Sequence, residues 1–204
     1  MLHDPAQVRA GFEHGAETFL EAMRAVDPGD WDKFGALGDW NVRQLAAHAM
    51  RAFVTVDGYL SAPPTVDRVI TDAVEYYRIV LTDPTVHQGV NARAKQASRQ
   101  IIDPLGEAEA VVARVLGVVA GCADDDRVNT FAGSMTLIEY LATRVVEIGV
   151  HTLDLQRATR QYPSLHPDTS AVVLRVLTEL ASPVALILAL TGREPLPDGH
   201  NVLQ

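Results

Sequence analysis

The sequence predicts an all-α protein. Apolar residues recur three and four positions apart along most of the 204 residues, which is the spacing of one helix face. Prolines and glycines cut these periodic stretches into helical lengths, and the alternating pattern of a strand is nearly absent. The one short strand candidate is Val128–Phe131. With 48% apolar and 21% charged residues, the chain has an ordinary globular composition and enough length for one core, or a core plus an appendage.

The first two predicted helices have clear start signals. Pro5 suits the first turn of a helix over Pro5–Val26, because its missing N–H has no role there. The glycines and proline of Asp27–Gly38 predict a loop. A second helix is predicted over Val42–Leu60, with Asn41 as N-cap and Gln44 completing a capping box. Two prolines after Leu60 prevent its continuation.

The middle of the chain is predicted to be helical with two interruptions. A shorter helix is predicted over Asp67–Leu81, and an Asp-Pro pair follows it. Helical spacing resumes over Val86–Cys122 but is broken near Asp103–Gly106, so two helices or one kinked helix are both compatible with the pattern. The triplet Asp124–Asp126 lacks the spacing of a calcium loop and is expected to be a solvated turn.

A long helix is predicted to open after Thr136, which forms a capping box with Glu139, and to run to Ala158. The stretch Gln161–Pro167 is a linker. The remaining chain holds two helical pieces and a turn-rich tail, namely Asp168–Leu180, Pro183–Leu190 and the residues from Thr191 onward.

The long helix carries one polar line on an otherwise apolar surface. The line consists of Tyr140, Arg144, Glu147, His151 and Asp154, whose spacing stacks them within an arc of about 80°. A helix that is apolar nearly all round is normally buried, so this line should point inward. Buried charged groups cost free energy unless they are paired or bind a metal. The line is therefore a candidate site, in which Tyr140 is expected to serve the core.

The same line supplies metal-ligating groups. Glu147 and His151 are four residues apart on one face, so both can reach one ion, and His48 from the second helix can add a third ligand. Two imidazoles and a carboxylate with an open fourth position are typical of catalytic zinc, and the open position admits water or a thiol. Asp154 and Arg144 are candidate catalytic residues. Asp154 can accept the second imidazole proton of a ligand histidine, and Arg144 can either bind an anionic substrate or neutralise Glu147.

Two segments resemble known motifs. The stretch from Trp40 to His48, Trp-Asn-Val-Arg-Gln-Leu-Ala-Ala-His, resembles the entry into the second helix of DinB-like metalloenzymes. The spacing of Arg, Glu, His and Asp between Arg144 and Asp154 resembles the matching motif of the mycothiol-dependent maleylpyruvate isomerase branch of that superfamily. The resemblance covers about residues 5–160.

The resemblance implies a fold and an activity. The expected architecture is a DinB-like four-helix bundle over residues 1–160 with a short helical extension over residues 161–204. One divalent metal, usually zinc, would be held by His48, Glu147 and His151. The implied activity is that of a transferase or isomerase, in which the metal lowers the pKa of a small thiol such as mycothiol for reaction with an electrophilic substrate. The founding isomerase has a separate C-terminal domain that contributes substrate contacts, whereas residues 161–204 here are predicted to be helical and are too short for such a domain. The resemblance therefore does not extend to maleylpyruvate as the substrate.

Several expectations about partners complete this interpretation. The partners are a small thiol and an electrophilic small molecule, and a homodimer is left open. Asn91 and Arg93, in the run Asn91–Lys95, can bind the polar groups of the thiol or belong to a solvated helix face. Two alternatives keep the helical fold: a metal-dependent hydrolase of a small molecule, and a non-enzymatic protein that sequesters a ligand.

Charge and composition argue against other classes. A net charge of −9 with a pI of about 5.1 argues against a general nucleic-acid binder. No apolar run reaches the roughly 18 residues of a membrane span, and the N-terminus lacks signal-peptide features. Cys122 is the only cysteine, which favours a cytoplasmic protein, and it lacks the cationic neighbour of a reactive thiol. The remaining histidines are expected to be surface residues without ligand partners: His3, His14, His87, His166 and His200.

Overall fold

The structure, a computed structural model, describes residues 4–64, 66–82, 96, 98–99 and 101–203. Its helices are α1 (Pro5–Arg24), α2 (Val42–Leu60), α3 (Ala73–Leu81), α5 (Pro104–Ala120), α6 (Leu137–Ala158), α7 (Pro167–Leu180) and α8 (Pro183–Leu190). Two antiparallel hairpins accompany them, β1 (Phe34–Leu37) with β2 (Trp40–Asn41), and β3 (Arg127–Thr130) with β4 (Gly133–Thr136). The described chain is mostly helical, which confirms the all-α class.

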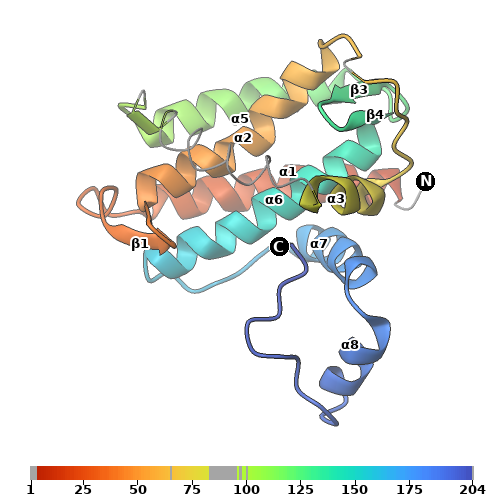
Figure 1. Ribbon diagram of the computed structural model, residues 1–204. Coiled ribbons are helices and arrows are strands. Elements are labelled where there is room, and N and C mark those ends of the chain that lie inside the picture. Colours follow the sequence, from red (N-terminus) through yellow and green to blue (C-terminus); the bar gives the residue numbers. More distant parts are fainter. Residues whose placement is uncertain (1–3, 65, 83–95, 97, 100, 204) are drawn as a thin grey trace.

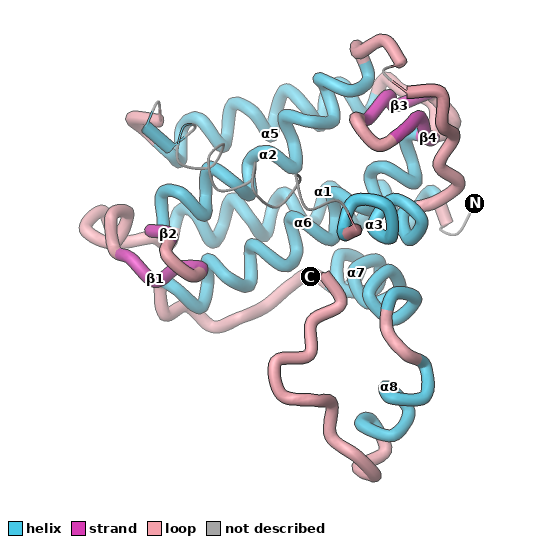
Figure 2. The backbone as a smooth tube through the Cα atoms, viewed as in Figure 1, coloured by secondary structure: helices cyan, strands magenta, loops and turns pink. Residues whose placement is uncertain are grey.

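Helix α6 lies at the centre of the packing. It contacts α1 and α2 along much of its length, and α5 lies beside α1 and α2 on the far side (Figure 1). Helix α7 packs on α1 and α6, whereas α8 contacts α7 and has no buried residue. The hairpins lie at opposite ends of the long helices (Figure 2). Within the described part of the chain, no helix combines the length and apolar character that a membrane crossing requires.

The core forms where the apolar stripes of α1 and α2 meet α6. The Phe53 ring of α2 lies 5.6 Å from the ring of Phe12 and 5.9 Å from that of Phe19, both on α1. All three side chains are fully buried, and each contributes on the order of 1.5–3 kcal/mol of transfer free energy. The first half of α6 is buried nearly all the way round, as its sequence predicts.

Helix α2 begins and ends where the sequence predicts. Asn41 accepts a hydrogen bond from the Gln44 amide at 2.9 Å, and the Gln44 side chain accepts one from the Asn41 amide at 2.9 Å. This capping box satisfies backbone donors that the first helical turn leaves free. It starts α2 in a register that turns Phe53 into the core and His48 toward α6.

Long-range contacts change one predicted helix start and one predicted helix cap. The third helix begins at Ala73 rather than Asp67, because Arg68 and Ile70 exchange backbone hydrogen bonds with Ser134 of β4 at 2.8 and 2.9 Å. Helix α6 does begin after Thr136, but the predicted capping box with Glu139 is absent. Glu139 is buried and accepts instead from the Ala73 amide at 3.3 Å.

The other boundaries differ in smaller ways. The predicted loop Asp27–Gly38 contains strand β1, and positive φ angles at Gly35 and Gly38 allow its tight return to β2. The strand predicted at Val128–Phe131 corresponds to β3, and its partner β4 was not predicted. Of the segment predicted as helical over Val86–Cys122, the part after Asp103 forms α5, and Asp103 caps it.

Candidate metal centre

The structure brings together the three predicted metal ligands. His48 projects from α2 and meets Glu147 and His151 of α6, and one candidate ligand atom from each lies within 4.8 Å of the others. The His48 and His151 rings are 4.7 Å apart and nearly perpendicular, at 78°. Nε2 of His151 lies 3.6 Å from Oε2 of Glu147. Ligands of a tetrahedral zinc ion are separated by roughly 3.3 Å, given metal–ligand distances of about 2.0–2.1 Å. The 3.6 Å separation of His151 and Glu147 is therefore close to that of two ligands of one ion.

His151 links the two carboxylates of the site. Its Nδ1 lies 3.1 Å from Oδ2 of Asp154, and its Nε2 faces Glu147 on the other side of the ring. Burial lowers the pKa of His151, but the hydrogen bonds to Asp154 and Glu147 outweigh it and raise that pKa to about 9. Burial raises the pKa of Glu147, but the His151 hydrogen bond and the charge of Arg144 outweigh it and hold that pKa at about 2. At neutral pH the metal-free site holds imidazolium and carboxylate.

His48 differs from His151 in its electrostatics. Burial, followed by the positive charge of His151, lowers the pKa of His48 to about 4, so this imidazole is neutral. Its Nδ1 is buried and has no hydrogen-bond partner among the described residues. Its ring packs edge-on against Trp40 at 5.0 Å. Burial of an imidazole nitrogen without a hydrogen-bond partner costs free energy unless an ion or a ligand binds to that nitrogen.

These observations fit a divalent metal. The metal requires a neutral imidazole and a carboxylate, which His48 and Glu147 already provide. Between Glu147 and Asp154, the protonated His151 ring carries a positive charge in the metal-free site. A bound metal ion would replace that charge when the ring loses its proton. Asp154 already contacts His151 through the nitrogen that does not face Glu147, as expected for a residue that orients a ligand histidine.

Arg144 lies one turn before Glu147 in the buried part of α6. Its guanidinium carbon is 4.8 Å from the centre of the Tyr140 ring, and its Nε donates to the Thr143 hydroxyl at 3.0 Å. Its charge lowers the pKa of Glu147. Tyr140 is fully buried and donates to the Thr55 hydroxyl at 2.8 Å, which fits the predicted core role.

Tyr77 of α3 is a site residue that sequence reasoning missed. Its hydroxyl donates to Oε1 of Glu147 at 3.2 Å and lies 3.1 Å from the Thr143 carbonyl oxygen. Burial and the Glu147 charge raise the pKa of Tyr77 well above its ordinary value, so the hydroxyl keeps its proton. In the sequence Tyr77 is one apolar position of a short helix, and only the packing of α3 on α6 brings it to Glu147.

We expect Tyr77→Phe to weaken metal binding by about 10-fold or somewhat more, because outer partners of metal ligands typically contribute 10–100-fold. The variant removes only the hydroxyl that positions Glu147. Tyr59→Phe is the matched control, since it removes the same hydroxyl from a ring that packs on the core residue Tyr140 at 5.7 Å. Competition with a chromophoric chelator measures both affinities, and equal loss in the two variants would contradict this role of Tyr77.

Other predicted residues have mixed outcomes. Asn91 and Arg93 lie outside the described residues, as do His3 and His87. The expectation of isolated surface histidines is wrong for His14 and His166, which are half-buried and lie against Asp168. His200 is exposed, and burial raises the pKa of Cys122, which fits an unreactive thiol.

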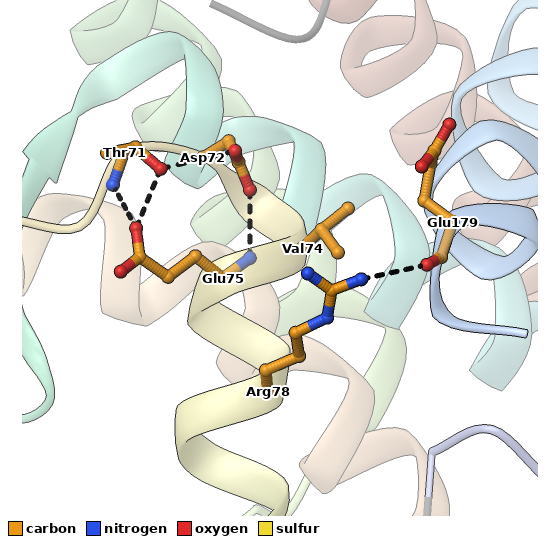
Figure 3. A pocket seen from close by; sticks show the side chains of 6 residues that line it. All are labelled: Thr71, Asp72, Val74, Glu75, Arg78 and Glu179. Carbon is orange, nitrogen blue, oxygen red and sulfur yellow. Dashed lines mark hydrogen bonds between the residues drawn. The ribbon is translucent and has the colours of Figure 1, made fainter.

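An open polar pocket lies between α3 and α7, and none of the three candidate metal ligands lines it (Figure 3). Its lining residues are Thr71, Asp72, Val74, Glu75, Arg78 and Glu179. Their polar groups largely satisfy one another: Glu75 accepts from the Thr71 amide and hydroxyl at 2.7 Å, and Asp72 caps α3. Arg78 donates to the Glu179 backbone oxygen at 3.2 Å. These contacts account for the pocket as a junction between two helices.

The fold and the donor set define a mostly helical protein with a His–Glu–His cluster between two of its packed helices. The family model described as the mycothiol maleylpyruvate isomerase N-terminal domain matches residues 30–156. This match covers more than half of the chain and contains all three clustered residues, so the chain belongs to that family. Neither the curated proteins nor the solved structures yielded a match.

Proposed function

We propose that the protein is a metal-dependent thiol transferase or isomerase that uses mycothiol or a related small thiol on an electrophilic substrate. The observation that carries the proposal is the convergence of His48, Glu147 and His151 within 4.8 Å, in a chain of the mycothiol maleylpyruvate isomerase N-terminal domain family. Two imidazoles, one carboxylate and an open position match catalytic zinc better than a closed structural site.

The proposal includes the architecture that the family resemblance implies. Helices α1, α2, α5 and α6 would form a DinB-like four-helix bundle within residues 1–160, and residues 161–204 would be an extension packed on it. Two observations support this division. The family match ends at residue 156, and α7 packs on α1 and α6 from outside the set of four helices.

In this proposal each residue has a distinct role. The metal, when bound, supplies a Lewis acid that lowers the pKa of a thiol. His48, Glu147 and His151 hold it, Asp154 fixes the His151 ring, and Tyr77 fixes the Glu147 carboxylate. Arg144 provides a buried positive charge beside the site, suited to an anionic group of the substrate or the thiol.

A thiol and a hydrolytic water would use the same open position, so the proposal needs a test that sees sulfur. Protein loaded with cobalt and mixed with mycothiol should gain near-ultraviolet absorption from sulfur-to-metal charge transfer. The same mixture with His151→Ala should stay without the band. Cobalt-loaded protein that shows no change with mycothiol or other cellular thiols would favour the hydrolase and overturn the thiol assignment.

A further inference from the structure

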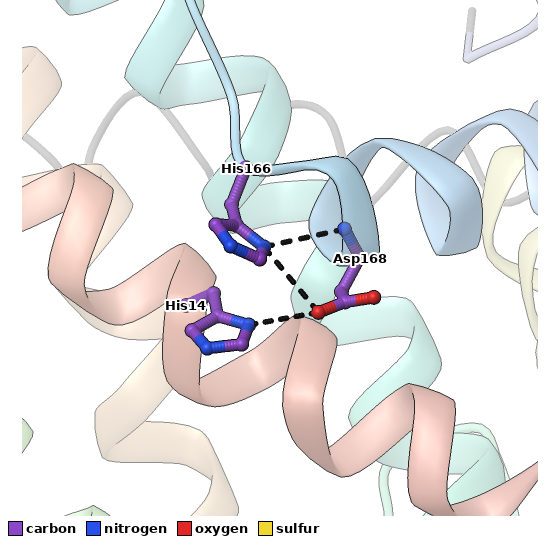
Figure 4. Close-up of side chains that lie close together, drawn as sticks. All are labelled: His14, His166 and Asp168. Atoms are coloured by element: carbon purple, nitrogen blue, oxygen red, sulfur yellow. Dashed lines mark hydrogen bonds and ion pairs between the residues drawn. The ribbon is translucent and has the colours of Figure 1, made fainter.

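A second cluster of metal-ligating side chains lies where α7 meets α1, outside the segment that matches the family. His14 belongs to α1, His166 is the N-cap of α7, and Asp168 lies in the first turn of α7 (Figure 4). Oδ2 of Asp168 is 3.0 Å from Nδ1 of His14 and 3.4 Å from Nδ1 of His166. The two imidazole rings are close and tilted by 35° to one another, with centres 3.8 Å apart.

The backbone around the cluster is held in one register. The Thr169 hydroxyl of α7 donates to the Gly11 carbonyl oxygen of α1 at 3.0 Å. A Cβ atom on Gly11 would lie only 3.2 Å from the Asp168 carbonyl oxygen, so glycine permits this close approach of the helices. One turn along, a Cβ atom on Gly15 would lie 3.4 Å from the Thr169 side chain, in ordinary van der Waals contact. The three side chains are therefore placed by two tightly packed helices, which preorganises them for a ligand.

The nitrogen–oxygen distances in this cluster are compatible with metal coordination as well as with hydrogen bonding. Neighbouring ligands of a tetrahedral ion with bonds of about 2.0–2.1 Å are roughly 3.3 Å apart, which lies between the 3.0 and 3.4 Å nitrogen–oxygen distances of the cluster. Imidazole nitrogen with carboxylate oxygen is a donor set typical of zinc, nickel and copper. The side chains are 34–41% exposed, so an ion can enter from solvent and complete its coordination with water.

The polar contacts of His166 within the cluster are long. Its Nδ1 lies 3.3 Å from the Asp168 amide nitrogen and 3.4 Å from Oδ2 of the same residue. Both distances exceed those of a typical hydrogen bond. A cation bound to this nitrogen and to Asp168 would replace these weak contacts with coordinate bonds.

We propose that His14, His166 and Asp168 form a second metal site for a divalent transition metal such as zinc, nickel or copper. All three residues lie outside residues 30–156, so this site belongs to the junction with α7 rather than to the family domain. Its ion would join α1 to α7 and stabilise the attachment of the C-terminal helices. Because the ligands are only half-buried, binding should be weaker and exchange should be faster than at the buried centre.

The test is a titration of tag-free, metal-free protein with Co2+ and then Zn2+. Wild type should bind two ions in two affinity classes, His14→Gln should lose the weaker class, and His151→Ala should lose the tighter one. Glutamine at position 14 keeps a neutral donor within reach of Asp168, which favours retention of the fold. His200→Gln removes an exposed histidine outside both clusters and should behave as wild type.

A second readout does not depend on the buried centre or on a mutation in the new site. In the His151→Ala protein, Zn2+ should shift the ring resonances of His14 and His166 and raise the melting temperature by several degrees. Unchanged resonances, or the same weak binding in His14→Gln as in wild type, would show that the cluster is only a hydrogen-bonded helix cap. Failure of this test would leave the proposed thiol chemistry untouched, because that chemistry uses His48, Glu147 and His151.

Discussion

His151→Ala is expected to remove tight metal binding while the protein remains helical. The imidazole joins Glu147 to Asp154, and its loss reduces the donor set to His48 and one carboxylate. Substitution of a residue that hydrogen-bonds to a metal ligand typically lowers metal affinity by about 10–100-fold, and the loss in His151→Ala should be larger than that. Competition with a chromophoric chelator measures the affinity, and circular dichroism reports the helical content.

The metal-free form of this variant should also lose stability. Without His151, Glu147 keeps the charge of Arg144 but loses the hydrogen bond that holds its pKa at about 2. In folded wild type the pKa of Glu147 is below its value in the unfolded chain, roughly 4.3. Its ionised form therefore contributes to folding stability above that pH, and this contribution is lost as pH falls toward 2. The stability difference between wild type and variant should therefore narrow in acid. His200→Ala is the control, and tight binding retained by His151→Ala would show that His151 is not a ligand.

Asp154→Asn is expected to weaken metal retention by about 10- to 100-fold with little change in the fold. The side-chain volume is nearly unchanged, and the asparagine oxygen can still accept a hydrogen bond from Nδ1 of His151. What disappears is the negative charge that makes the ligand imidazole more basic. The variant should fall between wild type and His151→Ala in the same chelator competition.

The metal-free Asp154→Asn protein offers an independent readout. Burial lowers the pKa of His151, and the hydrogen bond to Asp154 is the largest single contribution that raises it to about 9, so the variant should move this pKa down toward the ordinary value. Nuclear magnetic resonance of the His151 ring across a pH series measures the change. If Asp154 only braces α6, thermal stability will fall while metal affinity and the His151 pKa stay at their wild-type values.

Local signals in the sequence were enough to predict the site helices. The Asn41–Gln44 capping box forms within one turn, so the start of α2 follows from the sequence alone. The polar line on α6 likewise follows from helical spacing, and His48 joins it because α2 and α6 pack side by side. Residues that lie on one face of the same helix could therefore be predicted, together with the residues beside them on that face.

What the sequence could not predict depends on contacts between distant segments. Glu139 looks like half of a capping box, but the packing of α3 gives it the Ala73 amide instead. Tyr77 reaches Glu147 across the same junction. His14 and Asp168 are far apart in the chain, and their meeting requires the close approach of α7 to Gly11. No periodicity within one helix encodes these partnerships.

The most direct test of the central claim is the metal content of tag-free protein purified without chelator. The His14→Gln background removes the second cluster from the count. Elemental analysis should then find close to one divalent ion per chain, and the His151→Ala, His14→Gln double variant should contain almost none. If the His14→Gln protein is metal-free and takes up no Zn2+, Co2+ or Ni2+ on titration, then His48, Glu147 and His151 do not form a metal centre.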